Sequence, residues 1–148
     1  ENIEAVAELK AMNSLYLSRN AINDIAAVKG LSKIWSLYLR DNKVSDISPL
    51  SELTWLSNLD LKGNQISDVS PLESLTELRF TFLQANQLAD IAPLVRMAQK
   101  DVEGGNIRFA PFWNLYLGEN PLNDESGSSH LSALKEIGVR VKMKETDE

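Results

Sequence analysis

A short pattern of apolar and polar residues recurs along this chain at a fixed spacing. It reads leucine, any residue, leucine, two further residues and asparagine, and the first four copies begin 22 residues apart. A period of about 20 to 29 residues indicates a stack of small units that bury a core only between neighbours. The alternation around each Leu-x-Leu predicts one short strand per unit, and stacking makes these strands parallel. The copies are residues 15–20, 37–42, 59–64, 81–86 and 115–120.

The second half of each unit is equally regular. An apolar residue, an aspartate and another apolar residue follow the asparagine, and three units then carry a proline. The aspartate stands just before a short apolar turn, where a carboxylate can accept backbone N–H groups as an N-cap, and proline is compatible with a first helical turn. We therefore expect short helices or 3₁₀ turns opposite the strands. The aspartates are Asp24, Asp46, Asp68 and Asp90.

The asparagine that ends each copy has two interpretations. Its amide could contact a ligand, or it could point inward and satisfy backbone groups where the chain turns out of the strand. The inward amide is preferred, because buried backbone groups need partners and an amide offers both donors and an acceptor. The column comprises Asn20, Asn42, Asn64, Asn86 and Asn120.

Residues 37–50 and their copy, residues 59–72, resemble the internalin-like, 22-residue class of leucine-rich repeats, which is common in bacteria. The resemblance extends over residues 1–122. It implies an α/β fold: a right-handed solenoid with a parallel sheet on its concave side and short helices or 3₁₀ turns on its convex side. It also implies binding of proteins or peptides on the concave sheet.

The repeat divides the chain into consecutive units of one expected domain, residues 1–148. Residues 2–12 align with residues 24–34 after a shift of 22, so the chain begins halfway through a unit. We therefore expect it to be the C-terminal part of a longer repeat array. The expected units are a partial repeat 1–14, repeats 15–36, 37–58 and 59–80, a longer repeat 81–112, a last repeat 113–128 and a cap 129–148.

The C-terminal cap is expected to close the stack. Residues 129–137 have Leu131, Leu134 and Ile137 on one helical face, and Gly138 is a natural stop. Residues 139–143 then alternate as a closing edge strand, in which Arg140 and Lys142 discourage further pairing.

The fourth unit carries a 12-residue insertion, roughly residues 99–110, and has threonine at position 81 in place of the first leucine. A helix is expected from Leu94 to Val102. Insertions in repeat stacks often carry binding contacts. The preferred alternative is a longer helix with Phe109 and Phe112 filling the core, and in that case the insertion and Thr81 could compensate for each other.

Composition narrows the possible functions. A net charge of −6 argues against nucleic acid as a partner, because phosphate binding requires a clustered positive field. No apolar run approaches the roughly 20 residues that span a bilayer. The chain has no cysteine, which favours a bacterial or intracellular origin. The compartment stays open between the bacterial cell surface or medium and the cytoplasm.

Residues suited to catalysis are scarce. His130 is the one histidine, it lies in the cap, and it has no cysteine or second histidine with which to form a nucleophile pair or a zinc site. We expect no enzyme activity, no cofactor and no bound metal. A hydrolase or carbohydrate-processing role is the enzyme alternative. It would require a cleft with paired carboxylates, for which the outward residues offer only Asp60, flanked by Asp41 and Glu119.

The outward positions of the strands are the candidate binding site. The middle outward position carries an aromatic residue in four of five strands. Exposed rings are not needed for folding, so they indicate either a binding surface or cross-strand stacking without a partner. Trp35 and Trp113 flank this column and either extend the surface or cover the sheet edge. The predicted partner-binding residues are Tyr16, Tyr38, Arg40, Asp60, Lys62, Phe82 and Tyr116.

The predicted function is non-enzymatic recognition of a protein or peptide. Its alternative is a structural scaffold or spacer within a larger protein.

Overall fold

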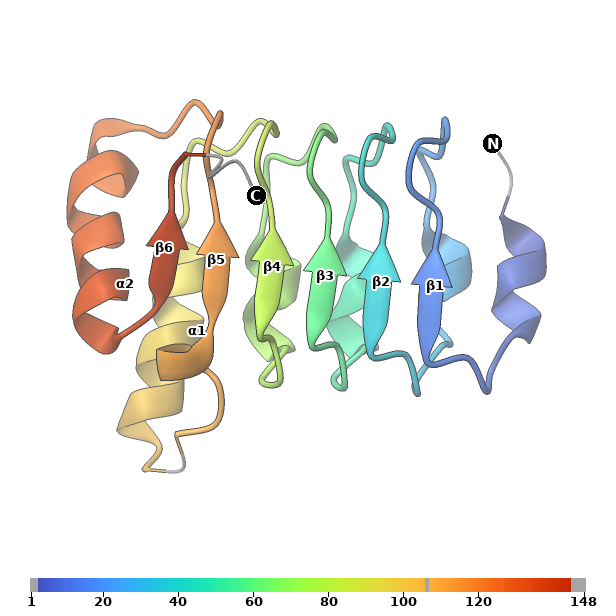
Figure 1. Cartoon of the computed structure of the whole chain (residues 1–148), viewed down its shortest axis with the longest axis horizontal. Helices are drawn as coiled ribbons and strands as arrows, with labels where there is room; N and C mark the ends of the chain where they lie inside the picture. Colours follow the sequence, from blue (N-terminus) through green and yellow to red (C-terminus); the bar gives the residue numbers. More distant parts are fainter. Residues whose placement is uncertain (1–2, 106, 145–148) are drawn as a thin grey trace.

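Within residues 3–105 and 107–144, which the computed structural model describes, six short strands form one parallel sheet in sequence order. Figure 1 shows the strands side by side across one face of the molecule, with the helices behind them. The sheet is open and its strands stack as in a solenoid, as predicted. The strands are β1 (Ser14–Tyr16), β2 (Ser36–Tyr38), β3 (Asn58–Asp60), β4 (Phe80–Phe82), β5 (Asn114–Tyr116) and β6 (Arg140–Lys142).

The strand register reproduces the sequence repeat. Leu15 lies opposite Leu37, and Leu37 lies opposite Leu59. Thr81 lies between Leu59 and Leu115, so the insertion after β4 leaves the register intact. The middle residue of each of these strands is buried, because alternate side chains of a strand point to opposite faces.

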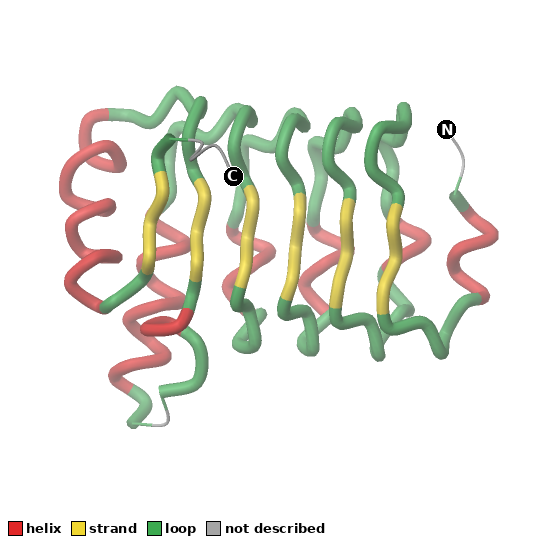
Figure 2. Tube along the Cα trace, in the orientation of Figure 1, coloured by secondary structure: helices red, strands yellow, loops and turns green. Residues whose placement is uncertain are grey.

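Short helices cover the convex side of the sheet (Figure 2). Where proline occurs it occupies the first helical turn, since its missing N–H has no intrahelical partner there. The 3₁₀ helices are η1 (Glu4–Glu8), η2 (Ala26–Val28), η3 (Ser48–Glu52), η4 (Ser70–Ser74) and η5 (Ala110–Phe112), and the α-helices are α1 (Ala92–Glu103) and α2 (Leu131–Ile137).

The aspartates stabilise the starts of the convex helices, but each lies one residue before the N-cap instead of at the N-cap. The N-cap of η3 is Ile47, which makes no side-chain cap bond. The carboxylate of Asp46 accepts the N–H of Ser48 at 2.8 Å, two residues onward, and the same bond recurs in the other three repeats. This backbone bond, together with one from the Ser48 side chain, lowers the pKa of Asp46. The predicted N–H acceptor role is confirmed, and the N-cap position is wrong.

Four of the five asparagines form an inward ladder, as predicted, whereas Asn20 is exposed. The Asn64 carbonyl oxygen accepts the N–H of Val44 in the preceding repeat at 3.0 Å. Its amide nitrogen donates to Leu61 at 2.9 Å and to Leu39 of the preceding repeat at 3.0 Å. Asn42, Asn86 and Asn120 repeat this arrangement. Each amide therefore joins two adjacent repeats.

The insertion lengthens the convex helix and fills the core, as the preferred interpretation stated. The predicted helix is α1, and the Asp101 carboxylate at its end accepts the N–H groups of residues 108, 109 and 110. Phe109 is fully buried. Phe112 is 52% exposed, so its predicted core position is wrong: η5 turns its side chain outward.

Trp113 is a core residue, contrary to both interpretations of it. Its side chain has no exposed surface and packs edge-on against Phe109, with ring centroids 5.4 Å apart. Its indole N–H donates to the Thr81 hydroxyl at 2.8 Å. A buried indole N–H needs an acceptor, and threonine provides one where the other repeats have leucine. The two departures in this repeat do compensate for each other.

The cap combines a helix and a strand as predicted. The helix α2 follows a π-helical turn, Ser126–His130, and ends at Gly138, whose φ of 105° suits glycine. The strand β6 pairs with β5 at the sheet edge. The last predicted cap residues, 145–148, lie outside the described residues.

Candidate functional site

The aromatic column, defined as Tyr16, Tyr38, Asp60, Phe82 and Tyr116, runs across the concave sheet from β1 to β5. Its rings form two stacked pairs. Tyr16 and Tyr38 have ring centroids 4.6 Å apart and planes 7° from parallel, while Phe82 and Tyr116 are 4.5 Å apart at 18°. These pairs are direct neighbours in the strand register, which fixes their spacing. The carboxylate of Asp60 separates the two pairs.

Stacking covers the rings only partly. Tyr16 at the edge of the stack is 72% exposed, and the other rings are half-buried. The rings therefore present a continuous apolar surface on either side of Asp60. The predicted cross-strand stacking of the rings is present. The stacked rings still leave part of their surface exposed to a partner.

Asp60 lies in an environment that disfavours its charge. Partial burial raises the pKa of its carboxyl group, and this effect outweighs the N–H of Lys62, which donates to the carboxylate at 3.1 Å, and the positive charge of Arg40. The charged carboxylate is thus held on the concave face at a cost in stability. Such a residue is a candidate for function, because stability alone would not favour it.

Asp60→Asn is expected to raise the melting temperature at pH 7. The folded-state pKa lies above the usual 3.8, so the charged form opposes folding at neutral pH, and the penalty disappears as the pH falls through the folded pKa toward 3.8. The gain of the variant should shrink over the same interval. Circular dichroism melts across pH measure it, with Asp124→Asn, an exposed carboxylate, as the control. A lower melting temperature for Asp60→Asn at pH 7 would contradict this assignment.

Two polar atoms of the neighbouring outward column lack hydrogen bonds. They are the Nε of Arg40 and the Oε1 of Gln84, both buried atoms within the described part of the chain. Arg40 Nε lies 3.4 Å from the Asp41 carboxylate, without hydrogen-bond geometry. Both atoms are covered by the protein, so a partner on the concave face does not reach them in this structure.

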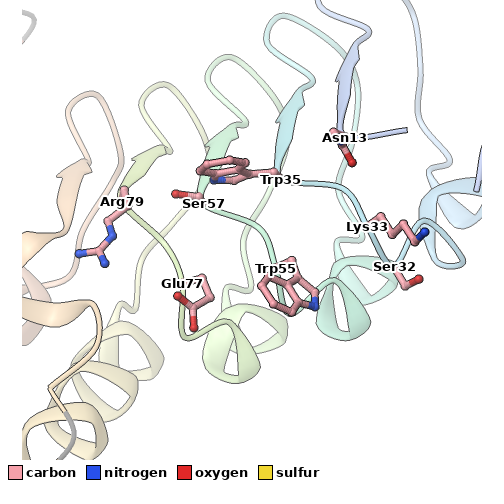
Figure 3. Close-up of a pocket in the computed structure, with 8 residues that line it drawn as sticks. All are labelled: Asn13, Ser32, Lys33, Trp35, Trp55, Ser57, Glu77 and Arg79. Carbon is pink, nitrogen blue, oxygen red and sulfur yellow. The ribbon is translucent and has the colours of Figure 1, made fainter. Parts of the chain in front are cut away.

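A groove that was not predicted from the sequence lies at the N-terminal ends of the strands. It encloses about 630 Å³, and its apolar walls are Trp35 and Trp55, which are 59% and 70% exposed. Figure 3 shows both indoles in the opening. Trp55 shares its repeat position with Lys33 and Glu77, and this tryptophan among polar residues is the signal that could have found it. The tryptophan groove is lined by Asn13, Ser32, Lys33, Trp35, Trp55, Ser57, Glu77 and Arg79.

The cap holds a serine, a histidine and an aspartate close together. The Ser126 hydroxyl lies 3.0 Å from His130 Nδ1, which is 3.8 Å from the Asp90 carboxylate. Ser126 is fully buried and its hydroxyl accepts the N–H of Ile91 at 3.1 Å. A substrate cannot reach this serine, so the cluster ties the cap to the last repeats.

Two carboxylates of the hydrolase alternative interact, because, besides burial, the charge of Asp41 contributes to the raised pKa of Asp60. Asp41 lies within 3.4 Å of Arg40 and 3.9 Å of Arg19, which balance its charge. Among residues 3–105 and 107–144, no three metal-ligating side chains gather into a possible metal site. None of the helices in those ranges is long and apolar enough to span a membrane.

Comparison with known proteins agrees with this architecture. Residues 36–74 match the family model described as leucine-rich repeats in two copies. The structure of internalin C2 from Listeria monocytogenes is similar at 29% identity and a TM-score of 0.78, covering 97% of this chain and 56% of that one. A second internalin of the same species, inlF, is 27% identical with a TM-score of 0.69, covering 100% and 45%.

A leucine-rich repeat protein of Leptospira interrogans, 20% identical, shares the fold with a TM-score of 0.78, covering 97% of this chain and 34% of that one. A search of curated proteins finds no match. The chain therefore has the leucine-rich repeat fold, and residues 36–74 match the family model itself. Its repeats are of the internalin-like kind, as the resemblance implied. It spans between about a third and just over half of the length of these structures.

Proposed function

We propose that this chain binds a protein or peptide partner on its concave sheet, with Tyr16, Tyr38, Phe82 and Tyr116 as apolar anchors. The leucine-rich repeat fold is generally a protein-interaction module. The observation that carries the proposal is the aromatic column itself: four rings in five outward positions, where the fold requires none.

The chain contains its own comparison for this argument. Asp60 occupies the same position in β3 as the rings do in β1, β2, β4 and β5, and its strand pairs in the same register. A polar side chain is therefore compatible with the fold at this position. The rings are better explained by recognition, because aromatic residues dominate the energetics of protein interfaces.

Polar residues would set the register of the partner. Asp60 stands between the two stacked pairs. Arg40 and Lys62 follow two residues after Tyr38 and Asp60, just beyond the ends of β2 and β3. Because the sheet is a rigid scaffold, binding would cost it little conformational entropy.

The test is affinity capture from the lysate and culture medium of the source organism. The parent chain is compared with a variant that carries alanine at Tyr16, Tyr38, Phe82 and Tyr116, after circular dichroism has verified its fold. The variant should bind the captured partner at least about 100-fold more weakly, because anchor residues each contribute about 2 kcal/mol or more.

The matched control is Phe112→Ala, which removes an exposed ring outside the aromatic column. It should retain the partner. Equal binding by the parent and the four-residue variant would contradict the proposal and favour the alternative of a structural scaffold or spacer within a larger protein.

A further inference from the structure

The tryptophan groove is not required by the fold. Trp35 directly precedes β2, and the same position before the neighbouring strands carries Asn13, Ser57 and Arg79. Trp55 shares its repeat position with Lys33 and Glu77. Since polar residues occupy these positions in the adjacent repeats, the two exposed indoles contribute little to folding. Exposed tryptophans that line a hollow usually mark a binding site.

The charges around the groove are predominantly positive. Glu77 is paired with the guanidinium group of Arg108, which neutralises it. Arg79 stands over the Phe112 ring at 5.2 Å from its centroid, and Lys33 is exposed. No carboxylate lies within ion-pair distance of Arg79 or Lys33 in the part of the chain that the structure describes. This local positive charge stands out in a chain of net charge −6.

The positive charges of the tryptophan groove lie at its two ends. Figure 3 shows Lys33 and Arg79 at opposite ends with the two indoles between them. A smaller hollow of about 190 Å³ continues from Trp55 past Glu77 to Arg108. An elongated ligand would therefore meet an apolar centre with a cation at each end.

The backbone carbonyls at the N-terminal ends of these strands are already hydrogen-bonded, which disfavours addition of a further strand there. The carbonyl oxygen of Asn13 accepts the N–H groups of Trp35 and Ser36 at 2.8 and 3.1 Å. The carbonyls of Trp35 and Ser57 each accept two N–H groups in the same way. Because each of these carbonyls already holds two bonds, a ligand must be recognised by side chains.

We propose that the tryptophan groove binds an extended acidic peptide segment of a partner protein, with an apolar side chain between the indoles and carboxylates at Lys33 and Arg79. The charge complementarity favours this ligand over a neutral oligosaccharide, which would use the indoles but not the two cations. The groove shares no residue with the aromatic column, so this proposal can be tested independently of concave binding.

The test is selection from a phage-displayed library of random 12-residue peptides, in parallel on the parent chain, a Trp35→Ala/Trp55→Ala variant and the four-residue variant of the aromatic column. The parent and the column variant should enrich the same acidic peptides with a central apolar residue. The tryptophan variant should not enrich them. Absence of such peptides from the parent selection would overturn the proposal, as would their retention by the tryptophan variant.

The charges are tested with the most enriched peptide, labelled with fluorescein and measured by anisotropy. Lys33→Glu/Arg79→Glu should weaken binding at least about tenfold, more at low salt than at high salt. Equal binding by this variant, or by a peptide with lysines in place of its acidic residues, would contradict the acidic ligand. Enrichment of peptides that depend only on the aromatic column would support binding on the concave sheet and overturn the proposal for the groove.

Two competing occupants give distinct results. Saturable binding of cellohexaose that is lost in the tryptophan variant, without any selected acidic peptide, would assign the groove to carbohydrate and overturn the proposal. Concentration-dependent dimerisation of the parent that Trp35→Ala/Trp55→Ala abolishes, seen by sedimentation, would assign it to a second copy of the chain.

Discussion

Asn64→Ala is expected to lower the free energy of unfolding by about 3–5 kcal/mol. The amide of Asn64 is buried and bonds the N–H of Val44 together with the carbonyls of Leu39 and Leu61. Alanine leaves the N–H of Val44 without a partner in a site that water does not reach, which costs about 1–3 kcal/mol. It also removes two amide-carbonyl bonds of about 1 kcal/mol each, although Asn42 and Asn86 still donate to the carbonyls of Leu39 and Leu61. Urea unfolding followed by circular dichroism measures the change.

Asn20→Ala is the matched control, because Asn20 occupies the same repeat position on the exposed side of β1. Its amide bonds carbonyls of its own repeat only, at 2.9 and 3.3 Å. The loss should stay below about 1 kcal/mol, as for a solvated hydrogen bond. Equal losses for Asn20 and Asn64 would contradict the ladder as the link between repeats.

Trp113→Ala is expected to cost about 3–5 kcal/mol, the range for truncating a large core aromatic. The indole is fully buried against Phe109, so its removal leaves a cavity beneath the insertion. Thermal or urea unfolding of the purified variant gives the value. A loss below about 1 kcal/mol would show that the core closes over this site without the indole.

A double-mutant cycle separates the hydrogen bond from the packing. Thr81→Val keeps the shape of the side chain and removes the acceptor of the Trp113 N–H, which should cost about 1–3 kcal/mol. In combination with Trp113→Phe, which removes the donor, the loss should be smaller than the sum of the single losses by about 1 kcal/mol or more. Strict additivity would contradict coupling between Thr81 and the insertion.

The repeat made most of the fold predictable. A strand, a turn with an inward asparagine and a convex helix follow from one 22-residue pattern, because every unit meets nearly the same neighbours. The exact position of the helix starts did not follow. The aspartate bonds to the N–H two residues onward, and this choice between adjacent positions depends on backbone angles that composition does not specify.

The insertion shows where the pattern loses its predictive value. Trp35 and Trp113 both stand directly before a strand, yet one is 59% exposed and the other is buried. Trp113 is covered because the insertion supplies Phe109 beside it and Thr81 supplies an acceptor. The identity of a residue at a repeat position therefore predicts its environment only while its neighbours also repeat.

The two candidate surfaces also differ in how far the repeat predicts them. The aromatic column was visible in the sequence, because it recurs with the strands, and its stacked pairs follow from the register. Trp55 lies three residues before β3, and no other repeat has a tryptophan there, so its only signal is a departure from the polar residues at the same repeat position. The raised pKa of Asp60 likewise depends on burial by its neighbours.

Cysteine footprinting tests concave binding most directly, and the absence of native cysteine makes it clean. Single variants Ser14→Cys, Ser32→Cys and Ser74→Cys place an exposed thiol on the concave sheet, in the tryptophan groove and on the convex side, respectively. Their alkylation rates are compared with and without the partner that the parent captures and the four-residue variant does not. The account predicts that the partner slows alkylation at position 14 at least about tenfold and leaves position 74 unchanged. Protection at position 74 with none at position 14 would contradict it.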